Sequence, residues 1–301
     1  ENAGNYYHDQ LIEVNGGKPQ IMKGYSTDNY SQWAIDYIRG QHRDASKPWY
    51  LWLCYGGVHS PYTPADRHKR NYPNAYVETP KDIYPPRPGK PDYMQKVATW
   101  EKGVKGEPVL KREAKGKQVG DDASAGKGRT LSDWVRQYNQ AVLALDEGIG
   151  KVLGALEETG QLKNTLVVFT ADQGFAWGQH GFRHKLAPYD ANIRAPLIVS
   201  LPGTLPEGKV CRAPVGGADL VPTFFRFAGL ETPWPMHGHD LTPLLKRLKL
   251  GTLLPTLPER LALARRDQLD YVAFLEVLLA DEVSRRDHGR LERQVLLAGF
   301  E

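Results

Sequence analysis

The sequence has few cysteines, no long apolar run and little excess charge. Its two cysteines, Cys54 and Cys211, are too few for a disulfide framework. No stretch reaches the roughly 18 apolar residues of a membrane-spanning helix, so no membrane segment is expected. The formal net charge of +4 over 301 residues is too small to indicate a nucleic-acid-binding face on the main part of the chain. What remains is a globular protein large enough to bury a core.

Two further expectations follow from these sparse features. Cys54 lies within the apolar run from Trp49 to Tyr55, which predicts buried free thiols. The opening residues, ENAGNYYHDQ, have neither the basic nor the apolar region of a signal peptide, and no initiator Met. They are compatible with a processed chain, a fragment or an incomplete gene model, and they leave the localisation undetermined.

Hydrophobic periodicity predicts an α/β fold. Apolar residues recur at helical spacing from Leu131 to Leu156, behind a capping box at Thr130 and Asp133. A buried strand at 166–170 follows directly, and an α-then-β unit favours a mostly parallel central sheet flanked by helices. Further strands are expected at 49–55 and 196–201, and further helices at 33–38, behind a cap at 25–28, and at 224–228.

Residues 80–129 are rich in Pro, Lys and Gly and show no period. They predict a long surface excursion, which either covers the site or is a solvated loop. In the first case its lysines would meet an acidic substrate, and the excursion would determine which substrate is bound.

Polar side chains follow two of the predicted strands at their carboxyl ends, where open α/β sheets bind ligands. Asp172 and Gln173 come directly after the strand at 166–170, and His59 follows the run at 49–55. A carboxylate and an amide carbonyl are oxygen ligands that suit a hard cation. Thiolates and a tight histidine set, which would indicate zinc, are missing.

The residues around Asp172 form an ordered set. A strand is followed by an acid, an amide and a glycine, then by G-x-H-G, a lysine, a tyrosine with an acid, an arginine, a proline and another strand. This order resembles the sulfatase family of the alkaline-phosphatase superfamily. The matching residues are Asp172, Gln173, Gly174, Gly178, His180, Gly181, Lys185, Tyr189, Asp190, Arg194 and Pro196.

The resemblance implies an alkaline-phosphatase-like fold and a metal-dependent sulfuric ester hydrolase acting on a sulfated small molecule or glycan. Asp172 and Gln173 would bind Ca²⁺, or else Mg²⁺, and Lys185 would contact the sulfate oxygens. His59 would donate to the sulfate or protonate the leaving group. His180 would orient a metal ligand or touch the substrate, and His184 is a further substrate-binding candidate without a firm counterpart in the family.

The resemblance covers only the latter part of a sulfatase. In that family the nucleophile is a formylglycine made within C/S-x-P-S-R, and two more metal-binding acids form an Asp-Asp pair on the first strand; neither feature is found here. The hypothesis is therefore a sulfatase-derived chain with feeble or no activity by itself. Two alternatives stay open: a phosphoester or phosphonate ester hydrolase of the same superfamily, and a non-catalytic fusion product.

The chain changes character near its end, where no lysine follows Lys249 and arginines become frequent. We expect a partial sulfatase domain over residues 1–246 and a helical tail over 247–301. The tail loosely resembles the amino-terminal helical segment of IstB-type transposase helper proteins. It lacks a Walker motif, so no ATP binding is implied, and a role in protein interaction is the remaining expectation.

Overall fold

The computed structural model describes residues 6–74, 76–111, 130–185 and 187–247, together with a few residues between 260 and 267. The chain divides into two compact units, Glu1–Val199 and Ser200–Glu301. Within the described ranges, no helix has both the length and the apolar character that crossing a bilayer requires.

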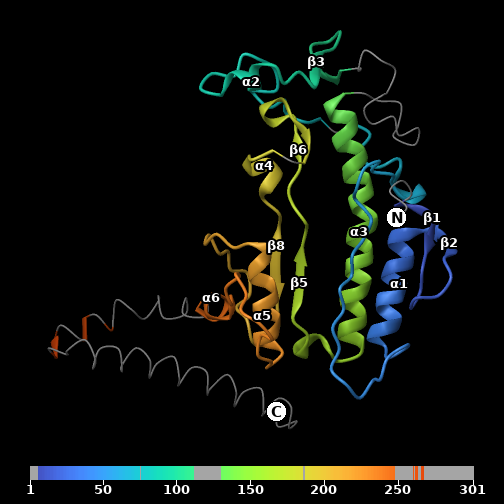
Figure 1. Cartoon of the computed structure of the whole chain (residues 1–301), viewed down its shortest axis with the longest axis vertical. Helices are drawn as coiled ribbons and strands as arrows, with labels where there is room; N and C mark the ends of the chain where they lie inside the picture. Colours follow the sequence, from blue (N-terminus) through green and yellow to red (C-terminus); the bar gives the residue numbers. More distant parts are fainter. Residues whose placement is uncertain are drawn as a thin grey trace. The chain divides into compact units, whose positions relative to one another are not determined.

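Two helices of the first unit, α1 (Ser26–Ile38) and α3 (Leu131–Glu158), lie side by side (Figure 1). They approach so closely that a Cβ at Gly148 would stand 2.3 Å from Ser31 Oγ. Thr130 and Asp133 form the predicted capping box of α3. The N-cap residue of α1 is Tyr25, within the predicted stretch 25–28, but the side-chain cap expected there is wrong because no side chain caps the first turn. The apolar contact is made by Ile35, Ile38, Ala155 and Leu156.

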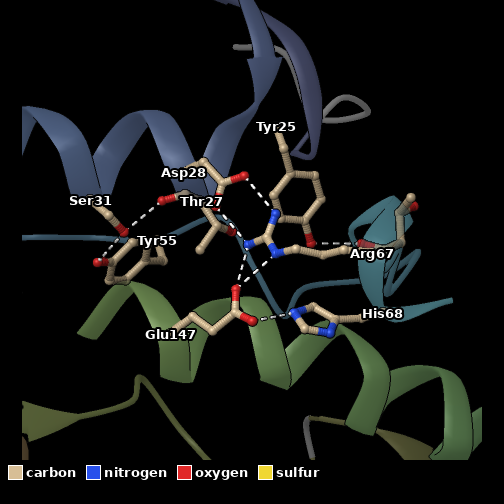
Figure 2. A network of polar contacts seen from close by, with 9 residues as sticks. Tyr25, Thr27, Asp28, Ser31, Tyr55, Arg67, His68 and Glu147 are labelled. Atoms are coloured by element: carbon tan, nitrogen blue, oxygen red, sulfur yellow. Dashed lines mark hydrogen bonds and ion pairs between the residues drawn. The ribbon is translucent and has the colours of Figure 1, made fainter. Parts of the chain in front are cut away.

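A polar network joins these helices to the short helix η1 (Asp66–His68), as Figure 2 shows. The Arg67 guanidinium donates to both carboxylate oxygens of Asp28 on α1, at 2.8 and 2.9 Å. It also donates to Glu147 Oε2 on α3, at 2.8 Å from Nε. His68 Nε2 lies 2.9 Å from the other oxygen of Glu147. One arginine therefore ties three elements together through its planar fork.

The described residues form four two-stranded sheets. Three are antiparallel pairs: β1 (His8–Ile12) with β2 (Gln20–Tyr25), β3 (Trp100–Lys102) with β4 (Pro108–Leu110), and β6 (Ala176–Trp177) with β7 (Arg183–His184). The fourth joins β5 (Val167–Thr170) to β8 (Leu197–Ser200), as expected from the strands predicted at 166–170 and 196–201.

The strand predicted at 49–55 is not formed. The segment has no ladder partner among the described residues, although its exposure alternates as in a strand, with Leu51, Leu53 and Tyr55 partly buried. On its other face Trp52 is 76% exposed and Tyr50 64% exposed. The buried thiols predicted from this run are wrong, because Cys54 and Cys211 are both free but exposed. In the described residues the central sheet is thus narrower than expected, and one apolar face of the 49–55 segment is exposed.

The described part of the predicted excursion, residues 80–111, is folded rather than a solvated loop. It contains α2 (Asp92–Gln95) and the β3–β4 hairpin. Trp100 and Leu110 of that hairpin are buried in one core cluster with Trp134 of α3. The sequence missed this because apolar residues in a short hairpin leave no period to detect. Residues 112–129 lie outside the described ranges.

Shorter helices complete the chain. The first unit holds η2 (Leu162–Asn164), η3 (Gln179–Gly181) and α4 (Asp190–Ile193). The second holds η4 (Gly217–Asp219), α5 (Leu220–Phe227) and α6 (Thr242–Arg247). Helix α5 agrees with the helix predicted at 224–228. The predicted tail at 247–301 lies outside the described residues, apart from Arg247 and a few positions between 260 and 267.

Candidate functional site

Asp172 and Lys185 lie in direct contact. Lys185 Nζ donates to Asp172 Oδ2 at 2.5 Å. The other carboxylate oxygen, Oδ1, accepts from the backbone N–H of Gln173 at 2.9 Å. The hydrogen bond from Lys185 is the largest cause that holds the pKa of Asp172 below its ordinary value of 3.8. The Asp172 side chain is 70% exposed and the Lys185 side chain 28% exposed, so the carboxylate is open to solvent.

The β6–β7 hairpin brings this pair together. Asp172 comes just after β5, and Lys185 is the first residue after β7. Ala176 pairs with His184 and Trp177 with Arg183, so the chain returns to the base of the hairpin where Asp172 lies. Trp177 packs against the core cluster that contains Trp100 and Trp134, and this contact anchors the hairpin to the core of the first unit.

Gly174 is required by close backbone packing. A Cβ at this position would lie 2.4 Å from the carbonyl oxygen of Ala191 and 2.6 Å from that of Arg194. Helix α4 therefore covers the turn that follows Asp172, and no side chain fits between them. The glycine of the Asp-Gln-Gly run is explained by this contact rather than by an unusual φ.

The oxygen ligands expected for a divalent cation are present only in part. Asp172 offers a carboxylate and Gln173 an amide, which suit a hard cation. In the part of the chain that the structure describes, no group of three or more His, Cys, Asp or Glu side chains is placed to hold a metal. The two residues fit one half of such a site, and further ligands would have to come from elsewhere.

His180 stands at the tip of the same hairpin and is held by a partner the sequence did not reveal. Asp82, from the excursion, accepts from the backbone N–H of His180 at 3.0 Å through Oδ1. Its other oxygen, Oδ2, makes a short hydrogen bond with His180 Nδ1. The His180 ring also lies against Tyr189, with 4.1 Å between ring centroids. Lys90 Nζ lies 4.5 Å from the centroid of the Tyr189 ring.

The remaining predicted residues are not joined to this group. His59 is exposed, and its Nδ1 lies 2.8 Å from the carbonyl oxygen of Ser60. Its ring packs against Tyr6, at 4.6 Å between centroids. No hydrogen bond or ion pair in the described ranges links it to Asp172 or Lys185. His184 lies in β7, and its side chain is outside the described part of the chain.

Asp82, Lys90 and Tyr189 are the residues that sequence reasoning did not assign to the site. Tyr189 is one of the ordered landmarks but carries no expected role. Asp82 lies 98 positions from His180, and no local pattern pairs the two. A carboxylate in a Pro-rich segment gives no signal of its own until the excursion is folded against the hairpin.

Comparison with known proteins now decides the family. The sequence profile described as Sulfatase matches residues 1–230. The chain belongs to the sulfatase family. It is 31% identical over 280 residues to N-acetylglucosamine-6-O-sulfatase of Bacteroides thetaiotaomicron, a match that covers 81% of this chain and 50% of the relative. The chain thus spans about half the length of that sulfatase.

Two solved structures extend the comparison. One is a protein in complex with its substrate D-glucosamine-2-N,6-O-disulfate, with a TM-score of 0.63 and 27% identity over 80% of this chain and 56% of that chain. The other is the phosphonate monoester hydrolase of Silicibacter pomeroyi, with a TM-score of 0.55 and 25% identity over 80% of this chain and 46% of that chain. The expected α/β fold of the alkaline-phosphatase-like sulfatases is confirmed.

Proposed function

We propose that this chain forms the metal-and-anion half of a sulfuric ester hydrolase whose substrate is a sulfated amino sugar or a related sulfated glycan. The observation that carries the proposal is the contact of Lys185 Nζ with Asp172, at 2.5 Å. A carboxylate suited to a cation thus stands beside a lysine suited to an oxyanion. The sulfated glucosamine bound by one structural relative supports the substrate class.

Each residue has a distinct task in this proposal. Hydrolysis of a sulfate monoester breaks the S–O bond to the leaving alcohol, adds water to sulfur and returns a proton to the leaving oxygen. Lys185 neutralises negative charge on the sulfuryl oxygens as a compact ammonium. His59 is the candidate that donates a proton or hydrogen bond to the substrate, His180 is the candidate that touches the substrate and exchanges a proton with it, and His184 is a further contact.

Asp172 and Gln173 would hold Ca²⁺ or Mg²⁺. Such a cation, when bound, supplies positive charge to the sulfuryl oxygens. One carboxylate and one amide bind a hard cation weakly, since affinity rises with the number and charge of the oxygen ligands. The formylglycine motif is not found in these residues, so we expect little or no turnover from this polypeptide alone.

A fusion assay tests the proposal. The part of the Bacteroides relative that this chain does not match is fused to it, and hydrolysis of glucosamine 6-sulfate is measured with Ca²⁺. We expect turnover that falls about 100-fold or more in Lys185→Met, as for loss of one oxyanion contact. Lys151→Met, on an exposed position of α3, is the matched control and should keep full activity.

The same assay separates the alternatives. Faster hydrolysis of a phosphonate monoester than of the sulfate would favour the phosphonate ester hydrolase, to which the structural likeness at 25% identity already points. Activity that survives Lys185→Met would overturn the anion-binding role. Full turnover by the unfused chain would refute the expectation that it is inactive by itself. Absence of activity in a well-folded fusion would favour a non-catalytic product.

A further inference from the structure

Asp82, in the excursion, supplies a carboxylate that faces two nitrogens of His180, the backbone nitrogen and the ring Nδ1. Asp82 Oδ1 accepts from the backbone N–H of His180 at 3.0 Å, and Oδ2 bonds to its ring Nδ1. A backbone N–H can only donate, and an ionised carboxylate can only accept. Since both oxygens of Asp82 are acceptors, Nδ1 must carry the proton that it shares with Oδ2.

The carboxylate is itself held in place by a buried arginine. Arg87 is fully buried, and its Nε donates to the backbone carbonyl of Asp82 at 2.7 Å. Its terminal nitrogens donate to the carbonyls of Ile83, Met94 and Val97. A Cβ at Gly181 would lie 1.9 Å from Arg87 Nη2, so the residue after His180 also rests on this guanidinium. Asp82 is thus fixed by the fold of the excursion before it meets His180.

The protonation state of Asp82 agrees with this geometry. Partial burial raises the pKa of Asp82, but the hydrogen bonds from His180 outweigh it and leave the pKa below the ordinary value of 3.8. Asp82 is therefore ionised at neutral pH and acts as an acceptor. The His180 side chain is 25% exposed, so its second nitrogen is not sealed from solvent or ligand.

We propose that Asp82 is a positioning residue that fixes the Nδ1–H tautomer of His180 and so presents Nε2 to the substrate. The geometry of the pair is independent of the proposed sulfatase function, but the identity of what Nε2 meets rests on it. The excursion therefore contributes a residue to the candidate site. A carboxylate that orients a histidine in this way sets which nitrogen can exchange a proton with a ligand.

Substitution of Asp82 by Asn is expected to move the proton of the His180 ring from one nitrogen to the other. The backbone N–H of His180 requires an acceptor, so the Asn oxygen must face it, and the Asn amide NH₂ is left facing Nδ1. Nδ1 then has to accept, and the proton moves to Nε2. Asp82→Asn is thus expected to reverse the tautomer with almost no change in shape. Asp92→Asn, the same chemical change on the same excursion, is the control.

The test is nitrogen NMR on the full chain with isotope-labelled histidine, at about pH 9, well above the roughly 6.5 of a free imidazole. His180→Asn identifies the signal. We expect Nδ1–H in the wild type and in Asp92→Asn, and Nε2–H in Asp82→Asn. An Nε2–H tautomer in the wild type would overturn the proposal even if Asp82→Asn did not fold, and so would an unchanged tautomer in a folded Asp82→Asn. Because no turnover is measured, failure of the sulfatase proposal would leave this result intact.

Discussion

Lys185 and Asp172 form an ion pair at 2.5 Å across the base of the β6–β7 hairpin. The lysine occupies one oxygen of the carboxylate that is expected to bind a cation. A cation and the Lys185 ammonium therefore compete for Asp172, and an incoming sulfate offers the lysine a new partner. Binding of the cation and binding of the anion should each favour the other.

Removal of the lysine should change the titration of Asp172. We expect Lys185→Met to raise the pKa of Asp172 toward the ordinary 3.8, because the hydrogen bond from Lys185 is the largest cause that lowers it. Carbon NMR of labelled aspartate carboxyl groups measures the shift. Lys163→Met, in η2, is the control and should leave the titration unchanged.

The sign of the related pH dependence follows from the same pair. Because the folded pKa of Asp172 lies below its unfolded value, the pair stabilises the fold above that unfolded value of 3.8. This contribution is lost as the pH falls below 3.8 through the lowered folded pKa. In Lys185→Met the free energy of unfolding should therefore fall less steeply with decreasing pH below 3.8 than in the wild type. A steeper curve in the variant would contradict the account.

Arg67 should matter more to stability than an ordinary surface arginine. It pairs with Asp28 through two hydrogen bonds and with Glu147 through a third, on two different helices (Figure 2). We expect Arg67→Met to lower the free energy of unfolding by about 1–3 kcal/mol. The control is Arg39→Met, whose single pair with Glu158 is exposed and worth about 0–1 kcal/mol. Urea unfolding followed by circular dichroism compares the two, and equal losses would argue against the network.

Two glycine-to-alanine changes should act in opposite directions. A Cβ at Gly174 would meet two backbone carbonyl oxygens, so Gly174→Ala should destabilise the turn after Asp172 by about 1–3 kcal/mol. A Cβ at Gly154 within α3 meets nothing within 4 Å, so Gly154→Ala should stabilise the chain by about 0.5–1 kcal/mol. Thermal unfolding of both variants checks the contrast. A stable, wild-type-like Gly174→Ala would show that α4 does not pack against this turn.

The thiols provide a simple check of the segment at 49–55. Cys54 and Cys211 are both exposed, so both should react with a water-soluble thiol reagent in the folded chain. Partial burial raises the pKa of the Cys54 thiol, so it should react more slowly at neutral pH than at alkaline pH. Cys54→Ser should remove one equivalent. If Cys54 reacts only after the chain is unfolded, the exposed face of the segment at 49–55 is covered in solution.

Local signals predicted the elements that local sequence dictates. The period of α3 and its capping box are confirmed, because a long amphipathic helix carries its own pattern. Asp172 and Lys185 were expected at one site only because of the ordered landmarks that resemble the sulfatases, and the β6–β7 hairpin that joins them was not predicted. The strand at 49–55 failed because a strand needs a partner, and apolar composition alone cannot supply one. The Asp82–His180 contact could not be predicted from the sequence, because the two residues are far apart in the chain and Asp82 lies in a segment without periodicity.

The most direct test of the account is the position of a divalent cation on the full chain. Mn²⁺, a paramagnetic stand-in for Ca²⁺ or Mg²⁺, is titrated into nitrogen-labelled protein, with affinity expected to be about millimolar or weaker. We predict amide broadening centred on residues 171–174 and 185, lost in Asp172→Asn and kept in the control Asp190→Asn, an exposed carboxylate of α4. Broadening that centres elsewhere, or that survives Asp172→Asn, would contradict the assignment of this site.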